Sequence, residues 1–366
     1  MHVFELTRTL IDIPSVTPEE EQVGVFLHDY LARLCAAHDG HVETMEVEPK
    51  RLNVFARFGE PVVTLSTHMD TVPPFIPSRE DDENIWGRGA CDTKGIIASM
   101  LIAAERLLES GVRNFGLLFV VGEERNSAGA YHAALNPRGS RFVINGEPTE
   151  NQLALGSKGA LRYELVARGR MAHSAYPELG ESAIEKLLDA LQAIRQIKLP
   201  VDPVLGPSTL NIGTIRGGRA PNVIPDEARA EIFIRLVCDS ESTRDAIRDA
   251  VGDKVGLNDV LEIPAIRMAA VEGLPTTVVA YTTDIPAFNG AWGQPLLLGP
   301  GTIHVAHTLD ERVPKQQLLD AVEIYQKMVK QLQRTDRASN DSKGSGNSGG
   351  FGRAVRSGAD SRERQA

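Results

Sequence analysis

Histidine and carboxylate residues follow the ends of four short apolar segments of the chain. They are His68 and Asp70 after PVVTLST, Glu123 and Glu124 after FGLLFVV, Glu147 after RFVIN, and His304 and His307 after PLLLGPG. Short apolar runs are typical of buried parallel strands, and open α/β sheets bind ligands beyond the carboxyl ends of their strands. A helix predicted to begin after Asp92 brings one more carboxylate to the same side. The sequence therefore predicts one cluster of imidazole and carboxylate groups at a sheet edge.

The chemistry that suits such a cluster is metal binding. Two imidazoles and three carboxylates form a set of nitrogen and oxygen donors that suits zinc. One carboxylate shared by two ions would hold them roughly 3.5–4 Å apart, where one polarises a carbonyl group and both lower the pKa of a water molecule. His68 and Asp70 lie two residues apart on one predicted strand and therefore share a face. We expect Asp70 to support the imidazole of His68.

Each of these motifs alone has a simpler interpretation. A Gly-Glu-Glu sequence after a strand is usually a solvated helix start, and a lone histidine is usually an exposed or satisfied side chain. Cys91 beside Asp92 suggests a thiol nucleophile, although cysteine is commonly just a small buried residue. The chain contains no Gly-x-Ser-x-Gly elbow of a serine hydrolase. The joint occurrence of the motifs, each after a predicted strand, favours the metal site.

The elements that must position these residues fall into two domains. Alternating apolar strands and helices predict a doubly wound α/β sheet for a catalytic domain formed by residues 1–157 and 269–334. Residues 158–268 instead show the order β-α-β-β-α-β, which predicts an inserted α+β domain of the ferredoxin-like type. Residues 335–366 are rich in Ser, Gly, Asn and Arg, so we predict a disordered tail there.

The bulk composition limits the compartment and the partners. The chain has 366 residues, a formal net charge of −10 and only three cysteines, which argues against a disulfide framework. The acidic charge argues against a nucleic-acid or anionic-membrane partner. The N-terminus lacks the pattern of a signal peptide, and no apolar run reaches the roughly 18 residues that a membrane span requires. We therefore expect a soluble cytoplasmic protein.

The ordered motifs resemble those of a known family. STHMDTVPP, GRGACDTKG, GEER, GEPT and GPGTIHVAHTLDE, with GRMAHSAYPELGESAI and GGRAPNVIPDEARA in the inserted segment, are similar to motifs of the acetylornithine deacetylase, succinyl-diaminopimelate desuccinylase and glutamate carboxypeptidase family. The resemblance covers nearly the whole chain except the tail. One departure is Thr93, where the family usually has methionine, and this change spares the ligand Asp92 and the lysine Lys94.

The resemblance implies a ligand set for two zinc ions, with cobalt as a possible substitute. His68 and Glu147 would bind one ion, Glu124 and His307 the other, and Asp92 would bridge them. The family pattern of Gly-Pro-Gly, a histidine and then an acidic pair matches His307, which precedes Asp310-Glu311, better than His304.

The resemblance also implies roles for residues that are not ligands. Glu123 would be the general base that takes a proton from water and passes it to the leaving amine, and Asp70 would orient His68. The inserted domain would be a lid and a dimerisation module, through which His173 steadies the oxyanion in the partner subunit of a homodimer. Asn222 and Arg235 would bind a substrate carboxylate, for which arginine suits by bidentate geometry.

The activity implied first is removal of the acyl group from an N-acyl amino acid, as by acetylornithine deacetylase. Desuccinylation and the cleavage of dipeptides or carboxyl-terminal residues from short peptides use the same chemistry and remain alternatives. A catalytically silent binding subunit would be expected to lack Glu123 or a metal ligand, and all are present. The tail has too few aromatic residues for stacking on RNA.

Overall fold

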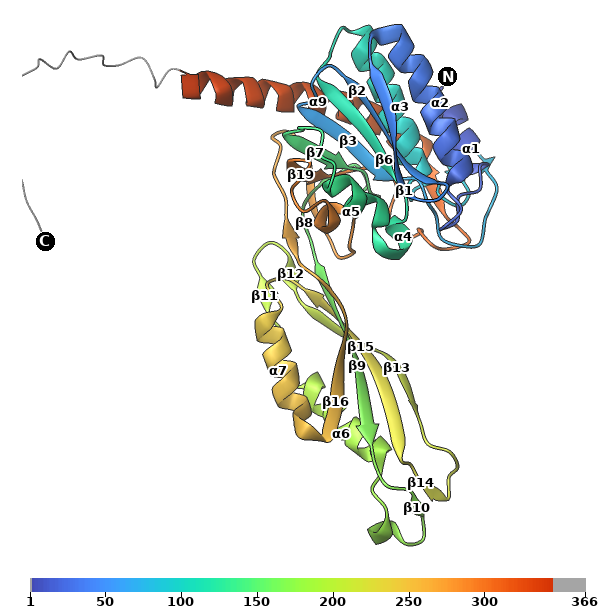
Figure 1. The fold of residues 1–366 in the computed structure, drawn as a ribbon, viewed down its shortest axis with the longest axis vertical. Coiled ribbons are helices and arrows are strands. Elements are labelled where there is room, and N and C mark those ends of the chain that lie inside the picture. Colours follow the sequence, from blue (N-terminus) through green and yellow to red (C-terminus); the bar gives the residue numbers. More distant parts are fainter. Residues whose placement is uncertain (1, 345–366) are drawn as a thin grey trace, which may run out of the picture.

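A six-stranded sheet lies at the centre of the larger domain in this computed structural model, which describes residues 2–344 (Figure 1). In spatial order its strands are β1 (His41–Glu48), β2 (Arg51–Phe58), β6 (Phe115–Val120), β3 (Val63–His68), β7 (Phe142–Asn145) and β19 (Gln294–Leu297). The strands from β6 to β19 run parallel, and β1 and β2 form an antiparallel edge. This confirms the predicted doubly wound α/β sheet.

Helices cover both faces of this sheet because successive side chains of its strands point to opposite sides. Leu117 and Phe119 of β6 pack in the cluster formed by α1 (Val3–Ile11), α2 (Glu21–His38), α3 (Lys94–Glu109) and α9 (Lys315–Gly344). Leu118 and Val120 face the other side, towards α5 (Ala128–Ala134) and α8 (Ile285–Phe288). The result is a three-layered domain with its largest core under α3.

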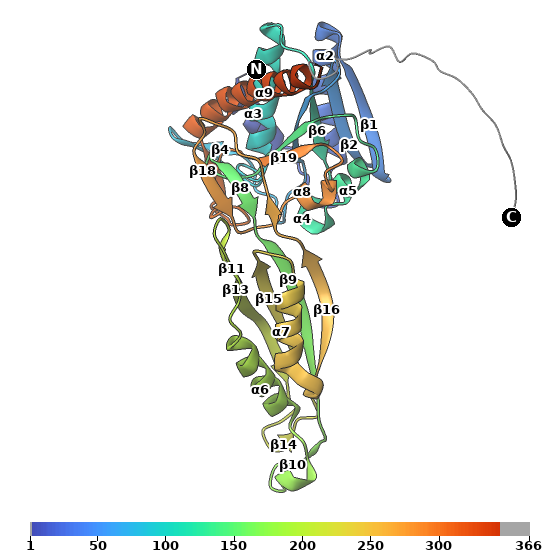
Figure 2. The same ribbon diagram turned by 90° about the vertical axis from the view of Figure 1, so that its left-hand side faces the viewer.

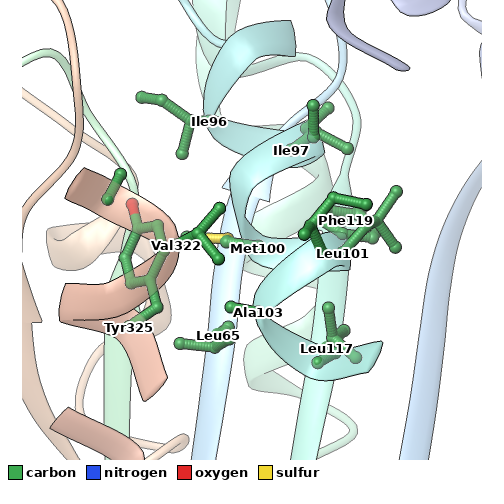
Figure 3. Packing of buried hydrophobic residues seen from close by; sticks show 14 of the residues in the cluster. Leu65, Ile96, Ile97, Met100, Leu101, Ala103, Leu117, Phe119, Val322 and Tyr325 are labelled. Carbon is green, nitrogen blue, oxygen red and sulfur yellow. The ribbon is translucent and has the colours of Figure 1, made fainter. Parts of the chain in front are cut away.

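Helix α3 is apolar around most of its circumference and is accordingly buried between the sheet and α9. Figure 3 shows Ile97 and Leu101 against Leu117 and Phe119, with Val322 and Tyr325 of α9 on the other side of the helix. The Tyr325 hydroxyl donates a hydrogen bond to the backbone oxygen of Leu298 (2.8 Å). This packing fixes the amino end of α3, which follows Asp92, at the carboxyl edge of the parallel strands.

The inserted domain is an antiparallel sheet with two helices on one face (Figure 2). Its elements are β9 (Gly159–Arg168), α6 (Ala183–Arg195), β13 (Thr209–Gly217), β15 (Glu227–Leu236), α7 (Glu241–Val251) and β16 (Val255–Ile263), with strand order β13-β15-β9-β16. This is the predicted ferredoxin-like arrangement. Even-numbered residues of β15, such as Ile232 and Ile234, lie under the helices, so its odd-numbered residues occupy the open face.

Shorter elements complete the described chain. One small sheet contains β4 (Arg79–Glu80), β5 (Asn84–Trp86) and β20 (Arg312–Pro314), and another contains β8 (Leu153–Ser157), β17 (Ile266–Arg267) and β18 (Thr276–Val279). Two strand pairs are β10 (Ala172–His173) with β14 (Val223–Ile224) and β11 (Val201–Asp202) with β12 (Gly206–Pro207). The remaining elements are the short helix α4 (Glu123–Asn126) and two 3-10 turns at Pro177–Leu179 and Gly252–Lys254. No helix among the described residues has the length and apolar character needed to cross a bilayer.

The predicted tail begins too early. Helix α9 continues to Gly344, so residues 335–344 are helical, and only the predicted tail residues 345–366 lie outside the described part of the chain. Gln333 explains part of the difference, because its side-chain amide donates to the backbone oxygens of Arg113 (2.6 Å) and Asn114 (3.0 Å) and holds the helix against the domain. Extending a formed helix requires ordering only one residue for each new hydrogen bond.

Candidate metal centre

The parallel strands bring the predicted ligands to one edge of the sheet. His68 is the last residue of β3, α4 begins at Glu123 shortly after β6, and Glu147 follows β7. Asp92 precedes α3, and His307 lies in the loop between β19 and β20. Since the carboxyl ends of β6, β3, β7 and β19 meet at the same edge, residues far apart in the sequence lie together there.

Asp92 lies between the two histidines. Its Oδ1 is 3.1 Å from His68 Nε2, and its Oδ2 is 3.3 Å from His307 Nε2. His307 Nε2 is also 3.0 Å from Glu124 Oε2. Ligand atoms of His68, Asp92 and Glu124 all lie within 4.8 Å of one another. One carboxylate therefore faces an imidazole on each side, as a carboxylate shared by two ions would.

The carboxylates of this cluster carry charges that burial makes costly. Burial raises the pKa of Glu147 well above its usual range, and the charge of Glu123 acts in the same direction. Hydrogen bonds to Asp92 and Glu124 raise the pKa of His307 to about 10. Deprotonated carboxylates and neutral imidazoles are what a divalent cation requires, and such a cation would replace the protons that the raised pKa values of Glu147 and His307 favour. The donor set thus fits a metal centre.

Asp70 connects His68 to the turn that carries the two glutamates. It is fully buried, and its carboxylate accepts hydrogen bonds from the backbone amides of Glu123 (3.1 Å) and Glu124 (3.2 Å) and from the Thr17 hydroxyl (2.6 Å). Its Oδ1 lies 3.4 Å from His68 Nδ1. Although burial opposes ionisation, these partners keep the pKa of Asp70 below its usual range. The ionised carboxylate can therefore orient His68 and α4 together.

The structure separates the two candidate histidines of the last motif. His307 adopts a left-handed backbone conformation (φ 63°) and contacts Asp92 and Glu124. Both histidines are exposed, but the hydrogen bond of His304 is a local one, from its backbone amide to Thr302 Oγ1 (3.5 Å). Of the two, it is His307 whose imidazole contacts Asp92 and Glu124.

Two other predicted site residues lie far from the cluster within one chain. His173 and Asn222 adjoin one another, because Ser174 N donates to the backbone oxygen of Asn222 (3.0 Å), and both belong to the tip of the inserted domain at β10 and β14 (Figures 1 and 2). His173 is exposed, and its Nδ1 accepts a hydrogen bond from the backbone amide of Ala175 (3.1 Å). A single chain therefore does not bring them to Asp92.

A cavity of about 620 Å³ opens beside the cluster, between the two domains. The larger domain contributes Asp92, Glu123, Glu124, Arg125, Asn126, Ser127, Tyr131, Glu147, Tyr281, Thr282, Thr283, Ile303, Ala306 and His307, and the inserted domain Arg235, Leu261, Glu262 and Ile263. Arg235, unlike Asn222, thus faces the same space as the cluster.

The sequence did not indicate two residues near this cavity. The Tyr281 hydroxyl donates to the backbone oxygen of Pro148 (3.0 Å) at the cavity wall. Asp284 is almost fully buried, and burial raises its pKa to about 7. The signal was present, because the polar run from Tyr281 to Asp284 follows the strand β18, but that strand has only four residues and a single buried one.

The fold and this site together define a metal-dependent hydrolase of amide bonds, and comparisons with known proteins agree. The sequence profile described as peptidase family M20/M25/M40 matches residues 64–331. A peptidase M20 domain-containing protein of Schizosaccharomyces pombe is 37% identical over 340 residues, covering 90% of this chain and 84% of the relative. A probable carboxypeptidase of Aspergillus terreus is also 37% identical, covering 88% and 84%.

The solved structures add a likeness of fold. The aminopeptidase PepT from Bacillus cereus superimposes with a TM-score of 0.75 at 19% sequence identity, covering 90% of this chain and 98% of that one. The chain belongs to peptidase family M20/M25/M40.

Proposed function

We propose that this protein hydrolyses the peptide bond of short peptides that carry a free terminal carboxylate, in the manner of a carboxypeptidase or dipeptidase. The observation that carries the proposal is that Arg235 lines the same cavity as the carboxylate and imidazole cluster. Relatives that are 36–38% identical are described as probable carboxypeptidases, and this supports the proposed peptidase activity.

Arg235 is suited to bind an anion. It lies on the open face of the inserted sheet, where Arg162 pairs with Glu231 and Arg229 with Glu164 and Glu227. Arg235 instead packs its guanidinium over the Phe233 ring at 4.7 Å and forms no ion pair with any residue between 2 and 344. A half-buried guanidinium without a carboxylate partner can bind the planar carboxylate of a substrate through two hydrogen bonds.

The metal site would hold two ions, zinc with cobalt as a substitute. We assign His68 and Glu147 to one ion, Glu124 and His307 to the other, and Asp92 to both, which matches the side of Asp92 that each histidine faces. When bound, such a pair polarises a carbonyl group and lowers the pKa of water.

We assign proton transfer to Glu123. Burial raises the pKa of Glu123 well above the usual range. The charge of His68 lowers this pKa, whereas the charges of Asp284 and Glu124 raise it. A carboxylate with a raised pKa accepts a proton from water more readily and can return it to the leaving amine. Its backbone is fixed by Asp70, so its side chain is held at the cavity wall.

A second candidate is deacylation of an N-acyl amino acid, as by acetylornithine deacetylase. Such a substrate also carries a carboxylate for Arg235, and the loop from Gly299 to Glu311 has the spacing that supports this branch. We further propose a homodimer formed through the inserted domain, in which His173 and Asn222 serve the partner's cavity. Their position at the exposed far tip of the domain supports this arrangement.

The test compares paired substrates in two variants. Zinc-loaded protein is assayed with dipeptides, the same dipeptides with an amidated carboxyl terminus, and N-acetyl amino acids. Arg235→Gln should lower kcat/KM for the free acids by about 10–100-fold, corresponding to the roughly 1.5–3 kcal/mol of a hydrogen bond to a charged group, and remove the preference over the amides. Arg162→Gln, on the same sheet face but paired with Glu231, is the matched control. Equal turnover of acids and amides by the wild type would contradict the proposal.

A further inference from the structure

Glu311 joins the loop that carries His307 to the loop that carries Asp92. It is almost fully buried, four residues after His307 and directly before β20. Its Oε1 accepts hydrogen bonds from the backbone amides of Gly89 (2.9 Å) and Asp92 (3.3 Å), and its Oε2 accepts one from Arg88 Nη1 (2.5 Å). All three donors lie in the segment that leads into α3. One side chain thus spans the two loops.

The partner of Glu311 is itself fixed in place. Arg88 is 2% exposed, pairs with no other carboxylate among residues 2–344, and also donates from Nε to the backbone oxygen of Pro74 (3.3 Å). A buried ion pair with these extra hydrogen bonds leaves the Glu311 carboxylate little freedom to rotate. Its position therefore determines where the backbone amide of Asp92 lies.

The same two loops also meet through close packing. A Cβ atom added at Gly301, in the loop of His307, would lie 2.4 Å from the Cβ of Cys91, beside Asp92. Gly301 has a φ of +88°, a conformation that favours glycine. The loops are therefore in direct contact at one point and held by the Glu311 carboxylate at another.

We propose that Glu311 is a positioning residue that sets the orientation of Asp92 relative to His307 and thereby the geometry of the metal centre; this rests on the ligand assignment of the proposed function. A bridging carboxylate must present its two oxygens to two different ions. Asp92 Oδ2 is 3.3 Å from His307 Nε2. Asp92 is anchored by the hydrogen bond from its backbone amide to Glu311, and His307 is anchored because it lies four residues before Glu311 in the same loop. Loss of the Glu311 carboxylate would therefore disturb first the site of the ion that we assign to Glu124 and His307.

The test measures cobalt binding directly. Chelator-treated protein is titrated with Co²⁺ while the visible absorption of the bound ion is recorded, and kcat and KM are measured on the loaded protein. Glu311→Gln should weaken binding of one of the two ions by about 10–100-fold, change the cobalt spectrum, and lower kcat by a similar factor with KM nearly unchanged. Leu31→Ala, which opens a cavity in the core at α2, should lower thermal stability but leave the spectrum and both affinities as in the wild type.

A second variant keeps the proposal testable if Glu311→Gln does not fold. Glu311→Asp keeps a charge opposite Arg88 but is one methylene shorter, so it releases the amides of Gly89 and Asp92 while the ion pair supports the fold. Wild-type cobalt affinity and spectrum in either folded variant would overturn the proposal. Failure of the proposed function gives a different result: the wild type would bind two cobalt ions and hydrolyse none of the substrates, and the comparison of cobalt spectra would still decide the role of Glu311.

Discussion

The carboxylate of Asp70 accepts a hydrogen bond from the backbone amide of Glu123 at 3.1 Å. The side chain proposed to orient the ligand His68 therefore also fixes the residue proposed as the base. His68 ends β3 and Glu123 begins α4 after β6, and these two strands are parallel neighbours. A single buried carboxylate thus links His68, the proposed metal ligand at the end of β3, to Glu123, the proposed proton acceptor after the neighbouring strand β6.

Replacing Asp70 should affect metal binding and catalysis together. Asp70→Asn keeps the size of the side chain, but its amide group cannot accept hydrogen bonds from both Glu123 and Glu124. We expect zinc affinity and kcat to fall by about 10–100-fold, as is usual when the group behind a metal-bound histidine is lost. Thr17→Val, which removes only the hydroxyl donor at 2.6 Å, should have a much smaller effect. Equal losses in the two variants would argue against the orienting role.

Replacing Glu123 should separate catalysis from metal binding. Glu123→Gln removes the proton acceptor but no assigned ligand, so we expect two bound metal ions and a kcat lower by about 10²–10⁴-fold. Glu124→Gln, one residue further, should instead lose metal, because Glu124 lies within 4.8 Å of His68 and Asp92. Metal content by elemental analysis and kcat on the same samples test both. A Glu123→Gln protein that keeps wild-type activity would exclude it as the base.

The two histidines of the last motif make a matched pair. His307→Ala removes the imidazole 3.0 Å from Glu124 and should reduce the tightly bound metal from two ions to one. His304→Ala, on the same loop but in contact with neither Asp92 nor Glu124 in the described part of the chain, should leave metal content and kcat within about twofold of the wild type, as for most surface substitutions. The reverse result would mean that the loop rearranges when metal binds and that His304 is the ligand.

Sequence reasoning predicted the fold and the cluster for the same physical reason. Apolar strands are recognisable when all their side chains are buried, as in β3 and β6, and the polar residues that follow them are then placed by the sheet. The inserted domain was recognisable because β9 and β15 alternate buried and more exposed residues. Only the contact with Asp92 and Glu124 distinguishes His307 from His304 in space.

The features that the sequence did not predict lie in short or polar elements. The bounds of strand β16 (Val255–Ile263) are not predictable from the sequence, because most of its residues are exposed and give no clear pattern. Helix α1 was not predicted; it has only nine residues and relies on packing against α3 and α9. Glu311 was seen only as part of an acidic pair, since its partners Arg88 and Gly89 lie more than two hundred residues away in the chain.

The dimer proposal predicts complementation between two inactive variants. If His173 serves the partner's cavity, His173→Ala and Glu123→Gln homodimers should each be nearly inactive. After exchange of subunits, a mixed dimer contains one cavity with both an intact Glu123 and an intact His173 from the other chain. Activity should therefore reappear on mixing. Sedimentation of the samples confirms the dimer, and a mixture that stays inactive despite proven exchange would contradict the proposal.

The most direct test of the central claim is metal titration of the stripped protein with a dipeptide substrate. Protein treated with a chelator should lack activity, and hydrolysis of a free-acid dipeptide should rise with added Zn²⁺ or Co²⁺ to a plateau at two ions per chain. That result would support the assignment of His68, Glu147, Glu124, His307 and Asp92 as ligands of a catalytic pair. Full hydrolysis by metal-free protein, or two tightly bound ions with no hydrolysis of any dipeptide or N-acyl amino acid, would contradict it.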